Sequence, residues 1–175
     1  MEVELKAKAP RGIEKKLAAA GAKKKSTSHQ FDTIYDKPGE PLGKKGATLR
    51  VREEDGKTIL TYKSKSKSKR VKAKEETELR VMRHIHIFLK GLGYIPIFTK
   101  EKTRTEYSLN SINVHLDKVK GLGTWLEFEA FGRAEPCRKK IVETAAILGI
   151  PEEKLSTESY IHLIREKLKS TKKQK

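Results

Sequence analysis

Charged and apolar residues alternate along several short stretches of the chain, and this alternation is its most informative pattern. Residues 2–8 place glutamates and lysines at even positions and Val3, Leu5 and Ala7 at odd positions. Because successive side chains of a β-strand point to opposite faces, this stretch predicts a strand with one charged and one apolar face. The alternation recurs later in the chain, with the charged members Arg50, Arg52, Glu76, Glu78, Arg80, Lys100, Lys102, Arg104, Glu127 and Glu129.

Turn residues and helical spacing divide the rest of the chain into elements. Strands are predicted over residues 1–8, 28–36, 47–54, 58–65, 75–82, 94–108, 111–119 and 125–131. Helices are predicted over residues 10–21 and 83–93, from Pro136 to Gly149, and after a cap near Ser156. Asp55 and Gly56 predict a tight hairpin turn. Residues 23–27 are expected to be a basic connection, residues 37–46 a loop, and the Lys- and Ser-rich residues 63–74 an exposed hairpin tip.

These elements predict an α+β fold. Apolar residues make up 35% of the 175 residues and charged residues 36%, which leaves little apolar surface for a large core. Strands that each carry one ionic face need a shared place for those faces. We therefore expect an eight-stranded antiparallel closed β-barrel with flanking helices and a charged interior. The expected single domain spans residues 1–168, followed by a frayed basic tail over residues 169–175.

The overall charge indicates a polyanionic partner. Lysine and arginine exceed aspartate and glutamate by 40 to 23, a formal net charge of +17. Composition alone does not separate nucleic acid, nucleotide and acidic membrane. Cys137 is the single cysteine, and neither a signal peptide nor a stretch of about 20 apolar residues is recognisable. We expect a cytoplasmic protein without membrane contact, and the scarcity of Asn and Gln hints at a thermophilic source.

Two pairs of glutamates have the spacing of a cation site. Glu2 with Glu4, and Glu127 with Glu129, lie two residues apart on predicted strands, so each pair projects from one face. Asp117, on the preceding strand, could add another oxygen. Ligands that offer only oxygen suit Mg²⁺ or Mn²⁺ rather than zinc. Any one pair could instead lie on a solvent-exposed strand face. If all the charged faces were exposed, however, several strands would be left with little apolar surface to pack against.

The basic residues of the same faces suit a polyphosphate. Arginine clamps phosphate oxygens with a fork of donors, and lysine supplies a point charge. The predicted triphosphate contacts are Lys6, Arg50, Arg52, Lys63, Lys102 and Arg104. Other charged residues expected on the interior face are Lys74, Glu76, Glu78 and Lys100. Burying so many ions is unfavourable unless function requires it.

Several short motifs, in this order, resemble the CYTH superfamily of triphosphate tunnel metalloenzymes. They are Glu2-x-Glu4-x-Lys6, Leu49-Arg50-Val51-Arg52, Leu60-Thr61-Tyr62-Lys63, Lys74-Glu75-Glu76-Thr77-Glu78, Lys102-Thr103-Arg104 and Trp125-Leu126-Glu127-Phe128-Glu129. Residues 29–36, Leu148-Gly149-Ile150 and Ser159-Tyr160 are most similar to the class IV adenylyl cyclase branch. That branch often has arginine where this chain has Lys74.

The resemblance implies a Mg²⁺- or Mn²⁺-dependent enzyme acting on a triphosphate. Glu2, Glu4, Glu127 and Glu129 would be metal ligands, and the six basic residues named above would contact the triphosphate. The first expectation is adenylyl cyclisation of ATP, in which pyrophosphate leaves. The alternative is hydrolysis of inorganic triphosphate or thiamine triphosphate. Related cyclases often pair, so a homodimer is a further implication.

A non-enzymatic nucleic-acid or polyphosphate binding protein is a second alternative, prompted by the net charge and by residues 63–74. Stretches that bind nucleic acid usually interleave aromatic with basic residues, and residues 63–74 contain no aromatic. We therefore do not expect nucleic acid to be the partner. His84 and His86 lack the spacing of a zinc site, residues 39–46 lack that of a P-loop, and no catalytic histidine is identifiable beside Cys137.

Overall fold

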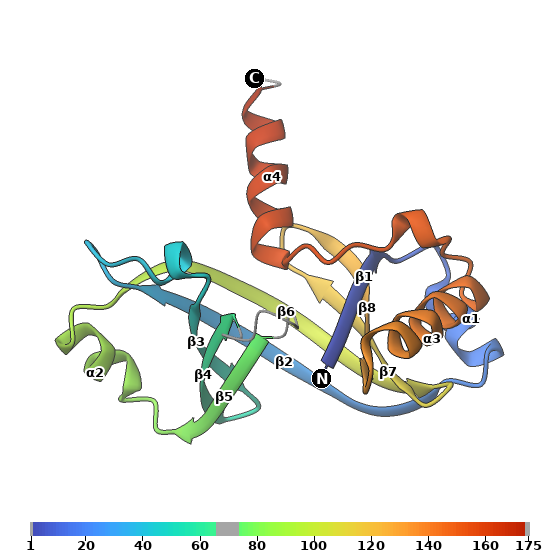
Figure 1. The fold of residues 1–175 in the computed structure, drawn as a ribbon, viewed down its shortest axis with the longest axis horizontal. Helices are drawn as coiled ribbons and strands as arrows, with labels where there is room; N and C mark the ends of the chain where they lie inside the picture. Colours follow the sequence, from blue (N-terminus) through green and yellow to red (C-terminus); the bar gives the residue numbers. More distant parts are fainter. Residues whose placement is uncertain (1, 66–73, 174–175) are drawn as a thin grey trace. The chain divides into compact units, whose positions relative to one another are not determined.

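The structure is a computed structural model that describes residues 2–65 and 74–173 (Figure 1). Its strands are β1 (Glu2–Lys8), β2 (Lys23–Asp36), β3 (Thr48–Glu54), β4 (Lys57–Lys65), β5 (Lys74–Val81), β6 (Ile95–Leu109), β7 (Ile112–Val119) and β8 (Gly123–Phe131). Its α-helices are α1 (Ile13–Ala19), α2 (Ile85–Gly91), α3 (Ala134–Ile147) and α4 (Tyr160–Lys173), with short 3₁₀ turns η1 (Leu42–Lys45) and η2 (Glu152–Lys154). Within the described ranges, none of the helices has the length and apolar character needed to span a membrane.

The strands form one eight-stranded sheet in the order β1-β8-β7-β6-β2-β3-β4-β5. The ladders between its neighbouring strands are antiparallel, as the β1–β8 and β3–β4 registers illustrate. The predicted α+β class and strand number are therefore confirmed, but the predicted closed barrel is wrong. β1 and β5 are the two ends of the strand order, and in the described part of the chain they do not pair with each other.

The error has a physical cause. Alternation determines which residues share a face of a strand, but it says nothing of whether the first and last strands of a sheet meet. The barrel was predicted because so many charged side chains needed a common interior. In the structure these side chains are stabilised by ion pairs with residues on neighbouring strands of the same face, and closure of the sheet is not required for that.

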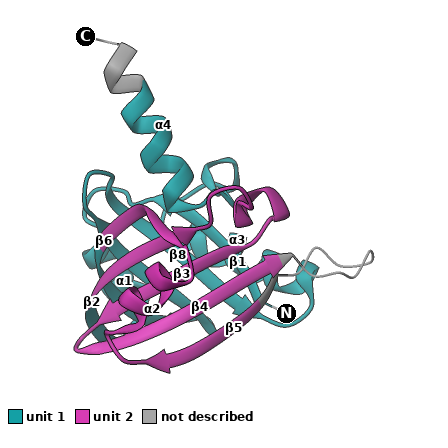
Figure 2. Cartoon of the chain, turned by 90° about the vertical axis from the view of Figure 1, so that its left-hand side faces the viewer, with its two compact units in different colours: residues 1–28, 102–175 teal, residues 29–101 magenta. Residues whose placement is uncertain are grey.

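The chain divides into two compact units (Figure 2). Unit 1 comprises residues 1–28 and 102–175, and unit 2 comprises residues 29–101. The long strands β2 and β6 run through both units, because each crosses a unit boundary along its length.

Unit 1 has an apolar core on one face of its strands. The odd-numbered residues of β1 and the even-numbered residues of β7 and β8 point to this face, where helices α1 and α3 cover them. Phe128 and Leu126 of β8, Ile141 of α3 and Leu17 of α1 are fully buried in it. The opposite parity of each strand carries the charged residues, as the alternation predicts.

Unit 2 repeats this division on a smaller scale. Tyr35 of β2 and Leu49 and Val51 of β3 pack with Leu89 of α2 to form its core. The other parity of β3 carries Arg50 and Arg52. Helix α2 therefore covers the apolar side and leaves the charged side of these strands clear of it.

The hairpin predicted at Asp55 and Gly56 is confirmed. Both residues have positive φ, 45° and 77°, as a two-residue turn between antiparallel strands requires, and Glu54 pairs with Lys57 across it. The hairpin tip expected over residues 63–74 cannot be compared in full, because residues 66–73 lie outside the described residues.

Two local predictions are wrong. Residues 23–27 are the exposed first part of β2 rather than a connection, since their exposed Lys, Ser and Thr residues carry no apolar alternation to reveal a strand. Ser156 does not cap the last helix, which begins at Tyr160. The Ser156 backbone instead forms an isolated bridge with Lys6 of β1, N to O at 2.8 Å and O to N at 2.9 Å.

Candidate active site

Unit 1 gathers charged residues from four strands on the sheet face opposite its core. The register of β1 with β8 sets Glu4 opposite Glu129 and Lys6 opposite Glu127. The register of β7 with its neighbours sets His115 opposite Glu127, and Asp117 opposite Arg104 of β6. Side chains directly opposite each other on antiparallel strands lie on the same face and close together. The sheet therefore builds a compact ionic cluster from residues far apart in the sequence.

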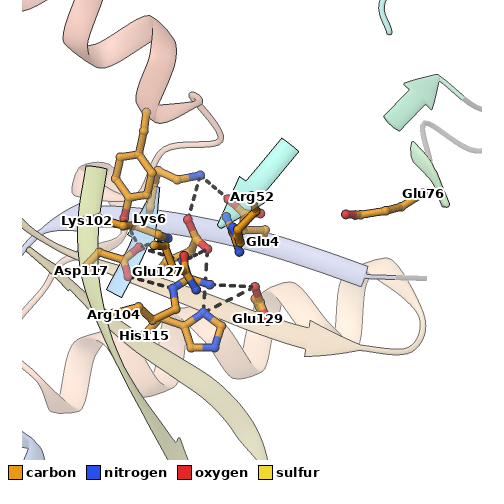
Figure 3. A network of polar contacts seen from close by, with 12 residues as sticks. Glu4, Lys6, Arg52, Glu76, Lys102, Arg104, His115, Asp117, Glu127 and Glu129 are labelled. Carbon is orange, nitrogen blue, oxygen red and sulfur yellow. Dashed lines mark hydrogen bonds and ion pairs between the residues drawn. The ribbon is translucent and has the colours of Figure 1, made fainter. Parts of the chain in front are cut away.

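Asp117 is the buried centre of this cluster (Figure 3). Its carboxylate accepts hydrogen bonds from Lys102 Nζ at 2.8 Å and from Arg104 Nε and Nη2 at 2.8 and 2.7 Å. The hydroxyl of Tyr160, at the start of α4, donates a fourth at 3.0 Å. Burial alone would raise the pKa of Asp117, but the hydrogen bonds from Arg104 and the charge of Lys102 outweigh it and lower the pKa.

Arg104 links Asp117 to the glutamates of β8. Its Nη2 donates to Glu127 Oε1 at 2.6 Å, and its Nη1 lies 4.0 Å from Glu129 Oε1. Lys6 contacts Glu4 and lies 3.7 Å from Glu127 Oε2. The predicted phosphate contacts of unit 1, Lys6, Lys102 and Arg104, are thus brought together and held by carboxylates.

The predicted metal ligands, with the exception of Asp117, lie in two groups of neighbouring donor atoms. Carboxylate oxygens of Glu2, Glu4 and Glu129 lie within 4.8 Å of one another, the separation at which one cation can be shared. Glu127 joins Glu129 in a second group. Asp117 belongs to neither group, and both of its oxygens accept hydrogen bonds from basic side chains.

His115 is a site residue that the sequence interpretation missed. It is buried on β7, and its Nδ1 lies 3.5 Å from Glu129 Oε1 and 3.8 Å from Glu127 Oε1. At these separations the contacts are electrostatic rather than hydrogen bonds. His115 lies two residues before Asp117, on the same face of the strand, so the alternation contained the signal for it.

The two glutamates of β8 differ in their ionisation. Burial raises the pKa of Glu129, and the nearby charge of Glu127 adds to this effect, while His115 and Arg104 oppose it. Burial also favours the neutral form of Glu127. There, however, the contact with His115 and the charges of Arg104, Lys102 and Lys6 prevail, and the pKa of Glu127 lies well below its usual range.

Tyr160 is a second residue that the pattern of charges did not single out. Its ring lies 5.5 Å from Lys6 Nζ and 5.4 Å from Lys102 Nζ, and edge-on to Trp125. Burial, followed by the charges of Asp117 and Glu127, raises the pKa of Tyr160 far above its usual value. The hydroxyl therefore remains a hydrogen-bond donor to Asp117.

Unit 2 has its own ionic cluster, with Asp32 of β2 at its centre. Arg52 binds the fully buried Asp32 through two parallel hydrogen bonds, Nε to Oδ1 at 2.7 Å and Nη2 to Oδ2 at 3.0 Å. Lys100 Nζ lies 2.9 Å from Oδ2. Burial would raise the pKa of Asp32, but the hydrogen bond from Arg52 and the charge of Lys100 lower it strongly. Asp32 was not predicted as a site residue, because only the strand register places it opposite Arg52.

The remaining predicted residues of unit 2 lie on the same strand faces. Arg50 Nη2 donates to Thr61 Oγ1 at 3.0 Å and to Glu78 Oε1 at 3.1 Å, and it lies 3.8 Å from Glu76 Oε1. Lys63 Nζ lies 2.5 Å from Glu76 Oε2. Lys74 begins β5, but its side chain lies outside the described residues. In both units, the described residues therefore pair cations with carboxylates on the charged strand faces.

The residues of unit 1 fit a divalent cation on two observations. Three carboxylates from two strands, Glu2, Glu4 and Glu129, offer oxygens within 4.8 Å of one another, a separation that one cation can share. In addition, the buried Nδ1 of His115 points at Glu127 and Glu129 and has no hydrogen-bond partner within residues 2–65 and 74–173. Oxygen and imidazole donors are both ordinary ligands of divalent metals.

Fold and site together define a class of protein. It is an α+β protein in which helices cover one face of an antiparallel sheet, while buried basic and acidic residues occupy the other. The family model of the CYTH domain matches residues 1–160, and the chain belongs to this family. The resemblance inferred from the sequence motifs is therefore confirmed.

Similar proteins span almost the same length. A Methanocaldococcus jannaschii protein named "Putative adenylate cyclase" is 28% identical over 174 residues, covering 93% of this chain and 98% of its own. Two solved structures from Pyrococcus horikoshii are also similar. One is 30% identical with a TM-score of 0.79, and the match covers 94% of this chain and 99% of that chain. The other is 26% identical with a TM-score of 0.80, and the match covers 95% of this chain and 99% of that chain. A Hippeastrum protein, described as a "Putative adenylyl cyclase" with a dominant triphosphatase activity, is 20% identical, with a TM-score of 0.69 and 94% of each chain covered.

Proposed function

We propose that this protein is a divalent-cation-dependent enzyme that acts on the triphosphate group of its substrate. The observation that carries the proposal is the arrangement in unit 1. Asp117 holds Lys102 and Arg104 in fixed positions, next to the group formed by Glu2, Glu4 and Glu129. Preorganised cations beside a carboxylate group suit a polyanion that arrives with a metal ion.

Glu2, Glu4, Glu127 and Glu129 are the residues that would hold Mg²⁺ or Mn²⁺. When bound, such an ion neutralises phosphate oxygens and makes the attacking oxygen a better nucleophile. Asp117 has a different role in this proposal. Because both of its oxygens already accept hydrogen bonds, it positions Lys102 and Arg104 rather than binding the cation.

Each unit carries basic residues that suit phosphate oxygens. In unit 1 these are Lys6, Lys102 and Arg104, and in unit 2 they are Arg50, Arg52, Lys63 and Lys100. Each is paired with a carboxylate, which orients it before the substrate binds. For Lys100, burial lowers the pKa, and the adjacent Asp32 opposes this by favouring the ammonium form. Arginine side chains can then present two donors to one phosphate.

Cyclisation of ATP is the first candidate reaction, because it is the activity in the name of the M. jannaschii relative. The ribose 3′-oxygen would attack the α-phosphorus, its proton would be lost, and the bond to the departing pyrophosphate would break. Hydrolysis is the second candidate, and the activity described for the Hippeastrum protein favours it. There a water oxygen would attack the terminal phosphorus and lose its proton, the bond to the bridging oxygen would break, and inorganic phosphate and the shortened diphosphate would leave.

Parallel incubations of the purified protein would test the proposal. ATP, inorganic triphosphate and thiamine triphosphate would each be supplied with Mg²⁺ or Mn²⁺, and cyclic AMP, pyrophosphate and phosphate measured. Cyclic AMP with pyrophosphate from ATP identifies the cyclase. Phosphate without cyclic AMP identifies the hydrolase, and it is accompanied by pyrophosphate when inorganic triphosphate is the substrate. Binding of triphosphate without any product would contradict the enzymatic proposal and favour a polyphosphate-binding protein.

Glu4→Gln and Glu129→Gln are the variants that test the cation ligands. Each removes one negative charge from the carboxylate group and keeps the size of the side chain, so we expect turnover to fall at least about 100-fold. Glu143→Gln, an exposed position on α3, is the matched control and should retain wild-type activity. Wild-type rates in both glutamine variants would remove the assignment of these residues.

A further inference from the structure

His115 introduces a nitrogen donor into a site that is otherwise built from carboxylates. Its side chain is 6% exposed, and Nδ1 faces Glu129 at 3.5 Å and Glu127 at 3.8 Å. Among the residues that the structure describes, Nδ1 has no hydrogen-bond partner. A buried polar atom without a partner is unfavourable unless something else satisfies it.

We propose that His115, Glu127 and Glu129 form a mixed nitrogen–oxygen cation position, which selects Mn²⁺ and similar transition-series ions over Mg²⁺. This inference rests on the proposed cation dependence and refines it. The second position, formed by Glu2, Glu4 and Glu129, offers oxygen only. Glu129 belongs to both groups, so the two cation positions are adjacent and chemically unequal.

The selectivity follows from the donors. Mg²⁺ prefers oxygen ligands and keeps much of its water shell, whereas transition ions accept imidazole nitrogen, with an affinity that rises from Mn²⁺ through Co²⁺ to Ni²⁺. His115 lies on β7, between the strands that carry Arg104 and Glu127, and this strand register holds its ring toward the carboxylates. Replacing it removes the one nitrogen donor of the group and should affect transition ions more than Mg²⁺.

A protonated His115 that only balances the two glutamates is the competing explanation. An imidazolium donating to a carboxylate normally brings nitrogen and oxygen to about 2.7–2.9 Å, whereas both separations here are longer. Arg104 already donates to Glu127 at 2.6 Å. The ligand atoms of His115, Glu127 and Glu129 all lie within 4.8 Å of one another, which suits one shared cation better than direct hydrogen bonds between them.

The direct experiment uses the wild-type protein with Mn²⁺ and no triphosphate. Electron spin-echo modulation of bound Mn²⁺ should show a coordinated nitrogen, and selective ¹⁵N-labelling of histidine should change that signal. Tightly bound Mn²⁺ without a histidine nitrogen signal would overturn the proposal. This measurement needs no variant, so it does not depend on whether a substituted protein folds.

The second experiment compares His115→Gln with His162→Gln, an exposed histidine of α4. Calorimetric titration of each protein with Mn²⁺ and Mg²⁺ gives four affinities relative to wild type. We expect His115→Gln to lose at least about 10-fold in Mn²⁺ affinity and less than about threefold in Mg²⁺ affinity, with His162→Gln unchanged. Equal losses for both ions, or no loss of Mn²⁺ affinity, would contradict selection by His115.

Both experiments are independent of turnover. If no triphosphate is processed but the nitrogen signal is present, the proposed function fails and the mixed cation position stands. If the protein turns over triphosphate but bound Mn²⁺ shows only oxygen ligands, the position fails and the function stands.

Discussion

At the scale of single residues, the buried aspartates organise the basic residues around them. Asp32 in unit 2 and Asp117 in unit 1 are both fully buried, and each accepts hydrogen bonds or ion pairs from an arginine and a lysine. Neither belongs to a candidate cation group. Their shared role is to hold positive side chains in place, so their removal should first be visible in stability.

Asp32→Asn should destabilise the protein by about 3–5 kcal/mol at pH 7, because Arg52 and Lys100 lose a buried counter-charge. The folded-state pKa of Asp32 is depressed below its unfolded value of about 3.9. Its stabilisation is therefore complete above that pH and declines as the pH falls toward the folded-state pKa. Urea unfolding of both proteins from pH 7 to pH 2.5 should show their difference shrinking below about pH 4.

Glu40→Gln is the control for this series. Glu40 pairs at 3.8 Å with Lys45, and both side chains are largely exposed. Such a surface pair contributes about 0–1 kcal/mol. A difference between wild type and Asp32→Asn that stayed constant from pH 7 to pH 2.5 would contradict the depressed pKa.

At the scale of elements, the start of α4 is attached to the ionic cluster at two places. The bridge between Ser156 and Lys6 fixes the segment before the helix, and Tyr160 places its hydroxyl on Asp117. The helix therefore contributes a hydrogen-bond donor and an aromatic ring to a site otherwise built from strands. Beyond this first turn, residues 165–169 are exposed.

Tyr160→Phe should lower the free energy of unfolding by about 1.5–3 kcal/mol, the usual contribution of a hydrogen bond to a charged group. The ring stays, so its contacts with Lys6 and Lys102 are kept and the loss isolates the hydroxyl. Chemical denaturation measures the change, and Tyr62→Phe, at a more exposed tyrosine on β4, should stay within about 0.5 kcal/mol of wild type. Equal effects of the two substitutions would show that the Tyr160 hydroxyl does not stabilise Asp117.

At the scale of the whole molecule, the chain carries a formal net charge of +17 and many paired ions in both units. Removing so many ions from water is unfavourable, and their mutual attraction only partly offsets it. A bound polyanion with its metal ion would supply additional attraction to the folded state alone. Substrate binding should therefore raise the thermal stability.

We expect Mn²⁺ with inorganic triphosphate, each at about 100 times its Kd, to raise the Tm by about 5–10 °C. Differential scanning calorimetry measures the shift, and a chelator should reverse the part that depends on the metal. Sulfate at matched ionic strength is the control, since it tests screening of the net charge. An equal shift with sulfate would indicate a general salt effect rather than a triphosphate site.

Much of the fold could be predicted from local sequence, and the reason is the range of the interactions involved. Alternation acts between neighbouring residues, so it correctly assigned Glu2, Glu4, Lys6, Glu127 and Glu129 to charged strand faces. The Asp55-Gly56 turn was predictable for the same reason, because positive φ is a property of the residues in the turn. Residues 23–27 were missed because an exposed strand needs no such alternation.

The sequence by itself therefore determined which residues share a face and, through its motifs, the family. Only the tertiary structure decided which partner each charge takes: Asp117 with Lys102 and Arg104, Asp32 with Arg52, and His115 with the glutamates of β8. Those pairings depend on strand order and register, which are set by contacts between residues far apart in the chain. For the same reason, only the tertiary structure showed that the sheet has two ends instead of closing on itself.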